Sequence, residues 1–370
     1  MTQSGLMLHR HVDVGQAPFA TIHDAEIEKL FKPLRNATGI VLAVSGGPDS
    51  LALLALMARW RNLNSLSTLP PIYVASVDHA LRANAAVEAN AVKVLASGLG
   101  FPVRVLVWQG EKPAGSIQEM ARTARYSLLC EAAQEWGASH IVTAHHRNDQ
   151  AETVLMRLAS GSGVGGLAAM RPFVALGLSA MDGRAPIALA RPLLGMTKAQ
   201  LETVILEAGF EAVDDPANRN PRFARARLRG LEAERNALGL SADRLATLAA
   251  RCARADSALS AVAQQRFSEL SEPGPTALRL KPALWFETEE IILRCIALAV
   301  TRLSECCGRA GDTQLSLERL ERLIEAFQTS RLEGQALHRT LHGMIVRLDA
   351  AGGVTVSREP ERRRGRKIVA

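Results

Sequence analysis

The sequence predicts an α/β fold: a parallel sheet with helices on both faces, followed by a mostly helical C-terminal region with a small β-hairpin. Three observations lead to this prediction. Short apolar runs rich in β-branched residues alternate with segments of helical spacing as far as residue 159. Polar clusters follow three of these runs, at the edge where parallel strands would end. Beyond residue 231 the chain is rich in leucine, alanine and arginine at helical spacing.

The opening strand, turn and helix are predicted around Val41–Ser50, V-L-A-V-S-G-G-P-D-S. The apolar start predicts a buried strand, which breaks at the Ser-Gly-Gly turn before helical spacing resumes at Leu51. Such a turn points main-chain N–H groups and the positive end of a helix dipole at one spot, and glycine lets an anion come close. The stretch therefore predicts a phosphate site. It is not a Walker A loop, because no Gly-Lys-Ser/Thr follows.

The same alternation predicts the other elements of the first half. Strands are expected at 71–77, 103–108 and 140–143, and helices at 84–99, 116–137 and 148–159. The second strand is followed by Asp78-His79-Ala80-Leu81-Arg82, and the fourth by a polar stretch at 144–152. Because parallel strands end at one edge of a sheet, these two clusters and the Ser45–Ser50 turn should share one cleft.

Asp149 and Glu152 are the acidic residues of the third cluster. They are three residues apart at the start of a helix, so both carboxylates lie on one face and near the favourable end of the helix dipole. Simple N-terminal capping is the alternative explanation for them. His145 and His146 lie beside them, but neighbouring residues at a strand end point to opposite sides, which disfavours a metal site with two histidines.

The C-terminal half is predicted to be helical at 241–267, 282–301 and 315–327, with a hairpin of 341–346 and 354–356 around a turn at 351–353. Trp285 and Phe286 are expected in its core. The stretch 358–367 is strongly basic. The domains expected are an N-terminal extension (1–37), an α/β domain (38–229) and a mainly helical C-terminal region with a basic tail (230–370).

Composition narrows the class of protein. The 370 residues are 48% hydrophobic, which favours folded domains with real cores over disorder. Lys and Arg number 44 against 37 Asp and Glu, a net charge of +7 that suits a polyanionic partner without establishing one. The five cysteines form no C-x-x-C, so neither a zinc knuckle nor a disulfide framework is indicated and a reducing cytoplasm is expected. No apolar run is long enough for a membrane span, and Met1–Arg10 does not read as a secretory signal.

The motifs resemble those of a known family. S-G-G-P-D-S resembles the SGGxDS pyrophosphate-binding loop of the PP-loop ATPases, also called N-type ATP pyrophosphatases. The pattern H-H-x-x-D-Q-x-E-T from His145 to Thr153 is similar to that of the tRNA(Ile)-lysidine synthases within this superfamily. Further similar segments are the Gly-rich stretch 161–167, R-P-L-L at 191–194, and D-P-A-N at 215–218 followed by Phe223, Arg225, Arg227 and Arg229. Ala217 and Ala226 replace the usual Ser and Asn.

The resemblance implies an activity. The protein would use ATP and Mg²⁺ to ligate free L-lysine to C2 of the wobble cytidine of the tRNA(Ile) with a CAU anticodon. An adenylated cytidine would be the intermediate, and the product, lysidine, would switch decoding from Met to Ile. This order has a chemical reason, because the C2 oxygen of cytidine is a poor leaving group and AMP is a good one.

The resemblance also implies residue roles. The residues expected to contact ATP are Ser45, Gly46, Gly47, Pro48, Asp49, Ser50, Asp78, His79 and Arg82. The catalytic residues expected are Asp49, Asp149, Arg225 and Arg227, with Asp49 organising Mg²⁺. Asp149 would orient and deprotonate the lysine amine, which has an ordinary pKa of about 10.4, and Glu152 would hold its ammonium groups. The residues expected to contact tRNA are Arg191, Arg225, Arg227 and Arg229. The resemblance further implies that 38–229 is the PP-loop ATPase catalytic domain and that 230–370 binds tRNA.

Alternative functions stay open from the sequence. A PP-loop tRNA thiolation enzyme is one, although the absence of a C-x-x-C counts against the members that use one. An ammonia-dependent synthetase acting on a small molecule is another, and a nucleotide-gated RNA-binding protein without catalysis is a third. The sequence leaves open a homodimer, and it does not say which arginine contacts the adenylate.

Overall fold

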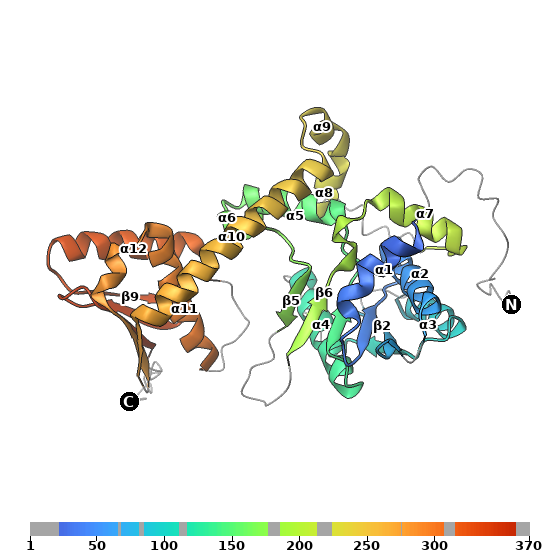
Figure 1. The fold of residues 1–370 in the computed structure, drawn as a ribbon, viewed down its shortest axis with the longest axis horizontal. Coiled ribbons are helices and arrows are strands. Elements are labelled where there is room, and N and C mark those ends of the chain that lie inside the picture. The colour runs from blue at the N-terminus through green and yellow to red at the C-terminus, as the bar shows by residue number, and fades with distance from the viewer. Residues whose placement is uncertain are drawn as a thin grey trace, which may run out of the picture. The chain divides into compact units, whose positions relative to one another are not determined.

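The computed structural model describes residues 22–65, 68–80, 85–110, 117–176, 186–212, 224–274, 276–306 and 315–359. The chain divides into two compact units. The first consists of Met1–Gly161, Leu167–Leu176 and Ala185–Ala250, and the second of Ser162–Gly166, Gly177–Arg184 and Arg251–Ala370. The boundary between the units in the C-terminal half falls at Ala250, some way beyond the domain boundary expected after residue 229. Figure 1 labels the elements of both units.

The first unit contains a six-stranded sheet of order β3-β2-β1-β4-β6-β5. Its strands are β1 (Ile40–Ala43), β2 (Ile72–Asp78), β3 (Val103–Val107), β4 (His140–Val142), β5 (Phe173–Leu176) and β6 (Ile187–Ala190). The pairs among β3, β2, β1 and β4 are parallel, as predicted, with Leu42 of β1 opposite both Val74 and Val142. Neither β5 nor β6 was predicted. β6 pairs parallel with β4, and β5 pairs antiparallel with β6 at the edge of the sheet.

Ten α-helices begin among the described residues as far as Ala242. They are α1 (Asp24–Phe31), α2 (Pro48–Leu63), α3 (Ala85–Gly98), α4 (Ile117–Glu135), α5 (Arg147–Ala159), α6 (Val164–Leu167), α7 (Lys198–Ala208), α8 (Ala224–Gly230), α9 (Glu232–Ala237) and α10 (Ala242–Leu270). The helices predicted at 84–99, 116–137 and 148–159 are confirmed as α3, α4 and α5. Thr197 caps α7 by accepting a hydrogen bond from the N–H of Gln200 at 3.2 Å.

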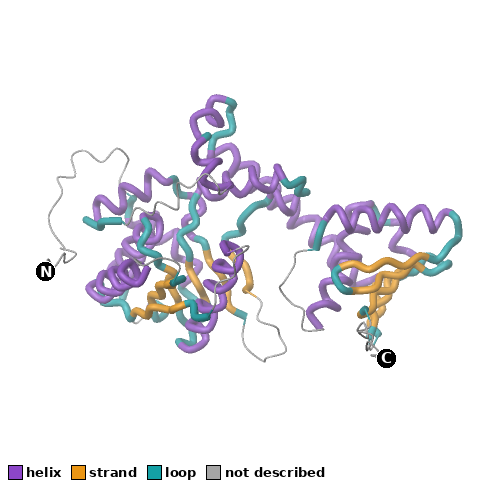
Figure 2. The backbone as a smooth tube through the Cα atoms, turned by 180° about the vertical axis from the view of Figure 1, so that it is seen from behind, coloured by secondary structure: helices purple, strands orange, loops and turns teal. Residues whose placement is uncertain are grey.

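Helices cover both faces of this sheet, as predicted (Figures 1 and 2). On one face, Ile40 and Leu42 of β1 share a core with α1, α2, α3 and α7. On the other, Val41 and Ile141 pack with Leu129 and neighbouring residues of α4. Successive residues of a strand point to opposite faces, so one apolar run such as I-V-L supplies both cores.

The described part of residues 1–37 belongs to the first unit. Ile27 and Phe31 of α1 are fully buried in the core that contains α2, and the rings of Phe31 and Trp60 lie 5.4 Å apart. Glu28 of α1 accepts the indole N–H of Trp60 at 3.0 Å. From Ile22 onward this segment therefore helps to hold α2, the helix that follows the predicted phosphate loop.

The second unit is built on a five-stranded antiparallel sheet of order β7-β8-β11-β10-β9. Its strands are β7 (Ser271–Pro273), β8 (Ala277–Leu280), β9 (Leu337–Leu341), β10 (Met344–Leu348) and β11 (Val354–Arg358), and its helices include α11 (Glu289–Cys306) and α12 (Leu317–Leu332). The predicted hairpin is confirmed as β10 and β11, with Val346 opposite Val356. The sheet around it is larger than predicted. α11 packs against β8, β10 and β11, and α12 packs against β9.

The helix predicted at 282–301 is instead two elements, a 3-10 turn at Pro282–Phe286 and then α11. Trp285 is half-buried and donates its indole N–H to the Gly352 carbonyl at 2.7 Å, which ties the turn to the β10–β11 loop. Phe286, however, is 91% exposed, so the expectation of a core position is wrong for this residue. A 3-10 turn has three residues per turn and presents the side chains of Trp285 and Phe286 in different directions. No helix among the described residues is long and apolar enough to cross a membrane.

Candidate active site

The loop between β1 and α2 has the geometry of an anion site. Gly47 is the N-cap residue of α2, and Pro48 occupies the first helical position, where a missing N–H costs nothing. Gly46 has a φ of 86°, a conformation that glycine adopts without strain. The Ser50 hydroxyl accepts the Ser45 N–H at 3.1 Å and donates to the Gly47 carbonyl at 2.9 Å, which fixes the turn.

The main-chain amides of this loop are available. Within the part of the chain that the structure describes, the N–H groups of Gly46, Gly47, Asp49 and Ser50 donate to no protein acceptor. A Cβ added at Gly47 would meet only the Ser45 hydroxyl, at 3.7 Å. The loop is therefore open at the start of a long helix, where the helix dipole favours negative charge.

A cavity of about 1020 Å³ lies at the carboxyl ends of the strands in the first unit. It is lined by Ser45 and Gly47–Ser50 from the loop, by Ser76, Val77 and His79 at the end of β2, and by Thr143–His146 after β4. α5 adds Asp149 and Glu152, and α8 adds Arg225 and Arg229. The three polar clusters thus share one cleft, as their places after the strands predicted.

His146 connects two of the predicted acidic residues. Its Nε2 lies 3.5 Å from Oδ2 of Asp49 and 3.5 Å from Oδ2 of Asp149, while its Nδ1 accepts the N–H of Asn148 at 3.2 Å. Acceptance at Nδ1 places the proton of the neutral ring on Nε2, facing both carboxylates. Burial lowers the pKa of His146, but the hydrogen bond to Asp49 and the charges of Asp149, Asp49 and Glu152 outweigh it and raise the pKa.

Asp149 has a structural role as well as its place in the cavity. Its Oδ2 accepts the N–H of His146 at 3.0 Å, which forms the capping box of α5. The capping explanation weighed for this residue is therefore correct, and it leaves Oδ1 of Asp149 directed elsewhere. That second oxygen accepts from Arg229 Nη2 at 3.3 Å.

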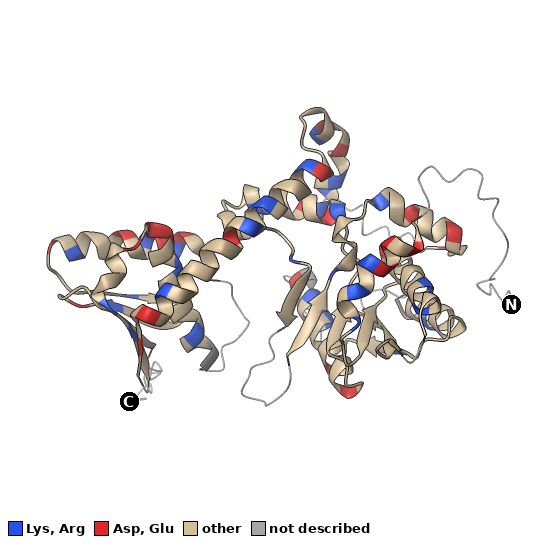
Figure 3. Cartoon of the chain, in the orientation of Figure 1, with Lys and Arg blue, Asp and Glu red and all other residues tan. Residues whose placement is uncertain are grey.

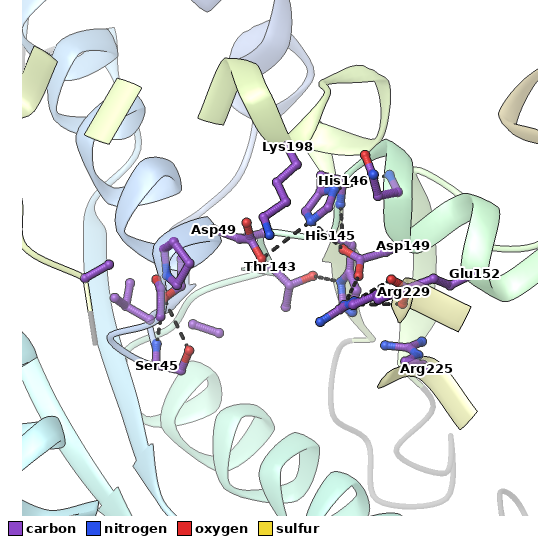
Figure 4. A pocket seen from close by; sticks show the side chains of 18 of the residues that line it. Ser45, Asp49, Thr143, His145, His146, Asp149, Glu152, Lys198, Arg225 and Arg229 are labelled. Atoms are coloured by element: carbon purple, nitrogen blue, oxygen red, sulfur yellow. Dashed lines mark hydrogen bonds and ion pairs between the residues drawn. The ribbon is translucent and has the colours of Figure 1, made fainter. Parts of the chain in front are cut away.

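Glu152 and Arg229 form the most closely bonded pair of the cavity (Figure 4). Arg229 Nε lies 2.5 Å from Oε1 of Glu152, and Nη2 lies 3.2 Å from Oε2, so the guanidinium contacts both carboxylate oxygens. Burial lowers the pKa of Arg229, but the Glu152 and Asp149 carboxylates outweigh it and raise the pKa. Both carboxylates expected to bind lysine are thus bonded to an arginine that was expected to contact tRNA.

His145, the other histidine of the motif, lies in a basic part of the cavity. Burial and the charges of Arg191, Arg125, Arg122 and Arg225 lower the pKa of His145 to about 3, so this ring is neutral. Its Nδ1 lies 2.9 Å from the Thr143 hydroxyl. The two histidines of the motif therefore face environments of opposite charge.

Arg122, Arg125 and Lys198 also line the cavity, and sequence analysis did not select them. Arg122 and Arg125 are three residues apart on α4, which places them on one face of that helix. This spacing was the available signal, but nothing in the sequence indicated which face turns to the cavity. Lys198 is the first residue of α7 and forms a 3.9 Å ion pair with Glu202.

The remaining predicted residues lie as follows. Asp78 is buried, and its Oδ1 accepts the N–H of Ala80 at 2.7 Å in the turn after β2. Arg82 lies outside the described residues. Arg191 is only 7% exposed, and its Nη1 donates to the Arg171 carbonyl at 2.8 Å. This interior position does not favour a contact with tRNA, so the contact stays a prediction. Arg227 is exposed on α8, a helix whose sequence contains three arginines. Figure 3 colours the lysines and arginines of the chain blue.

Fold and site together define the class. A parallel sheet with an open Ser-Gly-Gly loop at the start of α2 belongs to a PP-loop protein, and residues 19–232 match the PP-loop domain family. A U34-tRNA thiolase from Methanococcus maripaludis has a similar fold, with a TM-score of 0.50 and 14% identity over 61% of this chain and 77% of that one.

Comparison with characterised sequences narrows this class to one family. A tRNA(Ile)-lysidine synthase of Bradyrhizobium sp. BTAi1 is 43% identical over 93% of this chain and 96% of its own length. That of Rhodopseudomonas palustris is 43% identical over 94% and 99%, and that of Methylobacterium sp. 4-46 is 44% identical over 90% and 92%. The chain belongs to the tRNA(Ile)-lysidine synthase family.

Proposed function

We propose that this protein uses ATP to ligate L-lysine to C2 of the wobble cytidine of the CAU-anticodon tRNA(Ile). One observation carries the proposal: an open amide loop and two clustered carboxylates line the same cavity. The loop suits the pyrophosphate part of ATP, and the carboxylates suit an amine. A reaction that first activates a carbonyl oxygen and then brings in an amine needs both in one place.

The amides of Gly46, Gly47, Asp49 and Ser50 would hold the pyrophosphate as it leaves. Preformed N–H donors at a helix start stabilise developing negative charge without having to reorganise. The Ser45–Ser50 and Ser50–Gly47 hydrogen bonds support this role, because they fix the turn while leaving those four amides outward.

Asp49 is the proposed Mg²⁺ ligand. Its carboxylate lines the cavity beside the loop. No group of three or more acidic, histidine or cysteine side chains among the described residues could hold a metal ion by itself. This fits Mg²⁺, which usually binds through one or two carboxylates with phosphate oxygens and waters completing the shell. The ion would neutralise charge on the phosphates that Asp49 alone would repel.

Asp149 and Glu152 are the proposed lysine-binding residues, with Asp149 as the base. An amine with an ordinary pKa of about 10.4 is protonated at neutral pH and cannot attack until it loses a proton. The buried Glu152 would hold an ammonium group, and Oδ1 of Asp149, which accepts from Arg229 in the lysine-free protein, would accept the proton. The lysine nitrogen then bonds to C2 and AMP leaves.

Arg225 and Arg227 are the proposed contacts to the adenylate and to tRNA phosphates. Arg225 lines the cavity, and Arg227 is exposed on the same helix. The C-terminal region from residue 230 is proposed to contribute further tRNA contacts. Phosphate contacts of this kind position an RNA, while the base itself enters the cavity unstacked.

The test measures pyrophosphate release and labelled lysine incorporation, with and without a CAU-anticodon tRNA. We expect pyrophosphate release to require the tRNA and ATP, and lysine incorporation to require the tRNA, ATP and lysine together. Pyrophosphate release from the complete mixture of tRNA, ATP and lysine, with no lysine incorporated into the tRNA, would reject the proposal. A tRNA that gains sulfur instead would support the thiolation alternative, whose likeness to this chain concerns the fold alone.

A further inference from the structure

Arg229 occupies the carboxylates that the proposed function reserves for lysine. The contact spans 77 residues of sequence to Glu152 and 80 to Asp149, and it uses three hydrogen bonds. A positively charged side chain of the protein thus lies where the ammonium group of the substrate is expected. The question is whether the two cations bind together or exclude each other.

The two ends of this ion pair differ in their burial. The Glu152 side chain is 2% exposed, whereas the Arg229 side chain is 43% exposed. A buried carboxylate without a cation is costly, so Glu152 requires a positive partner at all times. The half-exposed guanidinium, by contrast, regains water when it leaves, so it can be exchanged for another cation at modest cost.

Every oxygen of the two carboxylates already accepts a hydrogen bond while Arg229 is bound. Both oxygens of Glu152 and Oδ1 of Asp149 accept from the guanidinium, and Oδ2 of Asp149 accepts the main-chain N–H of His146. A lysine ammonium has three donors and needs some of the same oxygens. A second cation at this position would also be repelled by the first.

We propose that Arg229 is an intramolecular placeholder for lysine, and that lysine binds to Asp149 and Glu152 only when this guanidinium leaves them. The inference rests on the proposed function. Arg229 then acts as a specificity-determining residue, because only a cationic side chain can replace it on a buried Glu152.

The placeholder also links lysine binding to tRNA binding. Arg225, Arg227 and Arg229 lie on the same helix, α8, which packs against α5. A polyanion that draws the arginines of α8 toward its phosphates would favour the released position of Arg229 and so open the lysine site. Linkage requires the reverse as well: lysine would strengthen the binding of tRNA.

The test is calorimetric titration of lysine into the tRNA-free protein. We expect Arg229→Gln to bind lysine at least about tenfold more tightly than the wild type, because the competitor is gone. The lysine affinity of Arg229→Lys should lie between those of the wild type and Arg229→Gln, since a single ammonium replaces the two-pronged guanidinium. Arg251→Gln, at an exposed arginine of α10, is the matched control and should leave lysine affinity unchanged. Equal or weaker lysine binding by a folded Arg229→Gln would overturn the proposal.

A second measurement uses the wild-type chain and so does not depend on the variant folding. Phenylglyoxal modifies exposed guanidinium groups, and mass spectrometry reports the rate at each arginine. Saturating lysine should accelerate modification of Arg229 and leave that of Arg251 unchanged. Slower or unchanged modification of Arg229 would mean that lysine and the guanidinium bind together, and the placeholder role would be wrong.

The two proposals fail differently. If the wild type incorporates lysine into tRNA but Arg229 behaves as a fixed partner in both measurements, only the placeholder role is lost. If the wild type neither binds nor incorporates lysine, the proposed function itself is rejected.

Discussion

Replacement of Asp149 by asparagine separates the two roles of this carboxylate. Asparagine is nearly the same size and keeps an oxygen that can accept the His146 N–H, now 3.0 Å from Oδ2. The capping box of α5 can therefore persist. What Asp149→Asn removes is the negative charge and the ability to take a proton from an amine.

The expected sizes of the two effects are very different. For stability, Arg229 loses its 3.3 Å contact with a charged oxygen but keeps both contacts with Glu152, so we expect a cost of about 1 kcal/mol or less. For the chemistry, a positioned general base contributes about 10²–10⁴-fold, or roughly 3–5 kcal/mol of activation free energy. The rate of lysine transfer should thus fall far more than stability.

The assay follows the two half-reactions in one set of mixtures. Nucleotide binding and tRNA-dependent pyrophosphate release should stay close to wild type in Asp149→Asn, while transfer of labelled lysine falls by at least about a hundredfold. Glu131→Gln, at an exposed carboxylate of α4, is the control and should change neither. Lysine transfer within a few-fold of wild type would refute the assignment of Asp149 as the base.

Three further predictions concern the loop, a histidine and α8. Gly46→Ala should weaken ATP binding by about tenfold or more, measured by calorimetry, because a φ of 86° costs an L-residue roughly 1–2 kcal/mol. Unchanged ATP affinity would mean that this loop does not bind the phosphates. His145 has a folded pKa lowered from 6.5 to about 3, so the unfolded chain takes up a proton that the folded one refuses. Its contribution to stability is present above 6.5 and is lost on acidification, so the unfolding free energy of the wild type should fall relative to His145→Gln by up to about 1.4 kcal/mol per pH unit. Parallel pH curves from denaturant titrations would contradict this. Arg227→Ala should weaken tRNA binding and reduce its logarithmic salt slope by about one, with Arg104→Ala on the edge strand β3 as control. An unaltered slope would mean that Arg227 contacts no tRNA phosphate.

The sequence predicted those parts of the molecule whose structure depends on residues close together in the chain. The strand, Ser-Gly-Gly turn and helix around Val41–Ser50 follow from neighbours in sequence, since a buried strand needs an apolar run and the turn needs a glycine at positive φ. The shared face of Asp149 and Glu152 follows from helix geometry alone. These elements placed the cavity correctly.

Long-range contacts were beyond the sequence. Nothing near Arg229 indicates that it reaches Glu152, and nothing near Arg122 indicates that α4 turns that residue to the cavity. The outer strands of the second unit were missed because β7 contains Pro273 and β9 is largely polar, so neither shows a buried apolar run. Phe286 shows the reverse error, an apolar residue that packing leaves in solvent.

The position of the His146 ring has a consequence for both carboxylates that it faces. A single N–H that is equally far from Asp49 and Asp149 cannot serve both carboxylates equally once either of them acquires another cation. The imidazole is therefore a shared partner of the carboxylate at the nucleotide loop and the carboxylate of α5, so a substitution at either acid is expected to change the hydrogen bonding of the other.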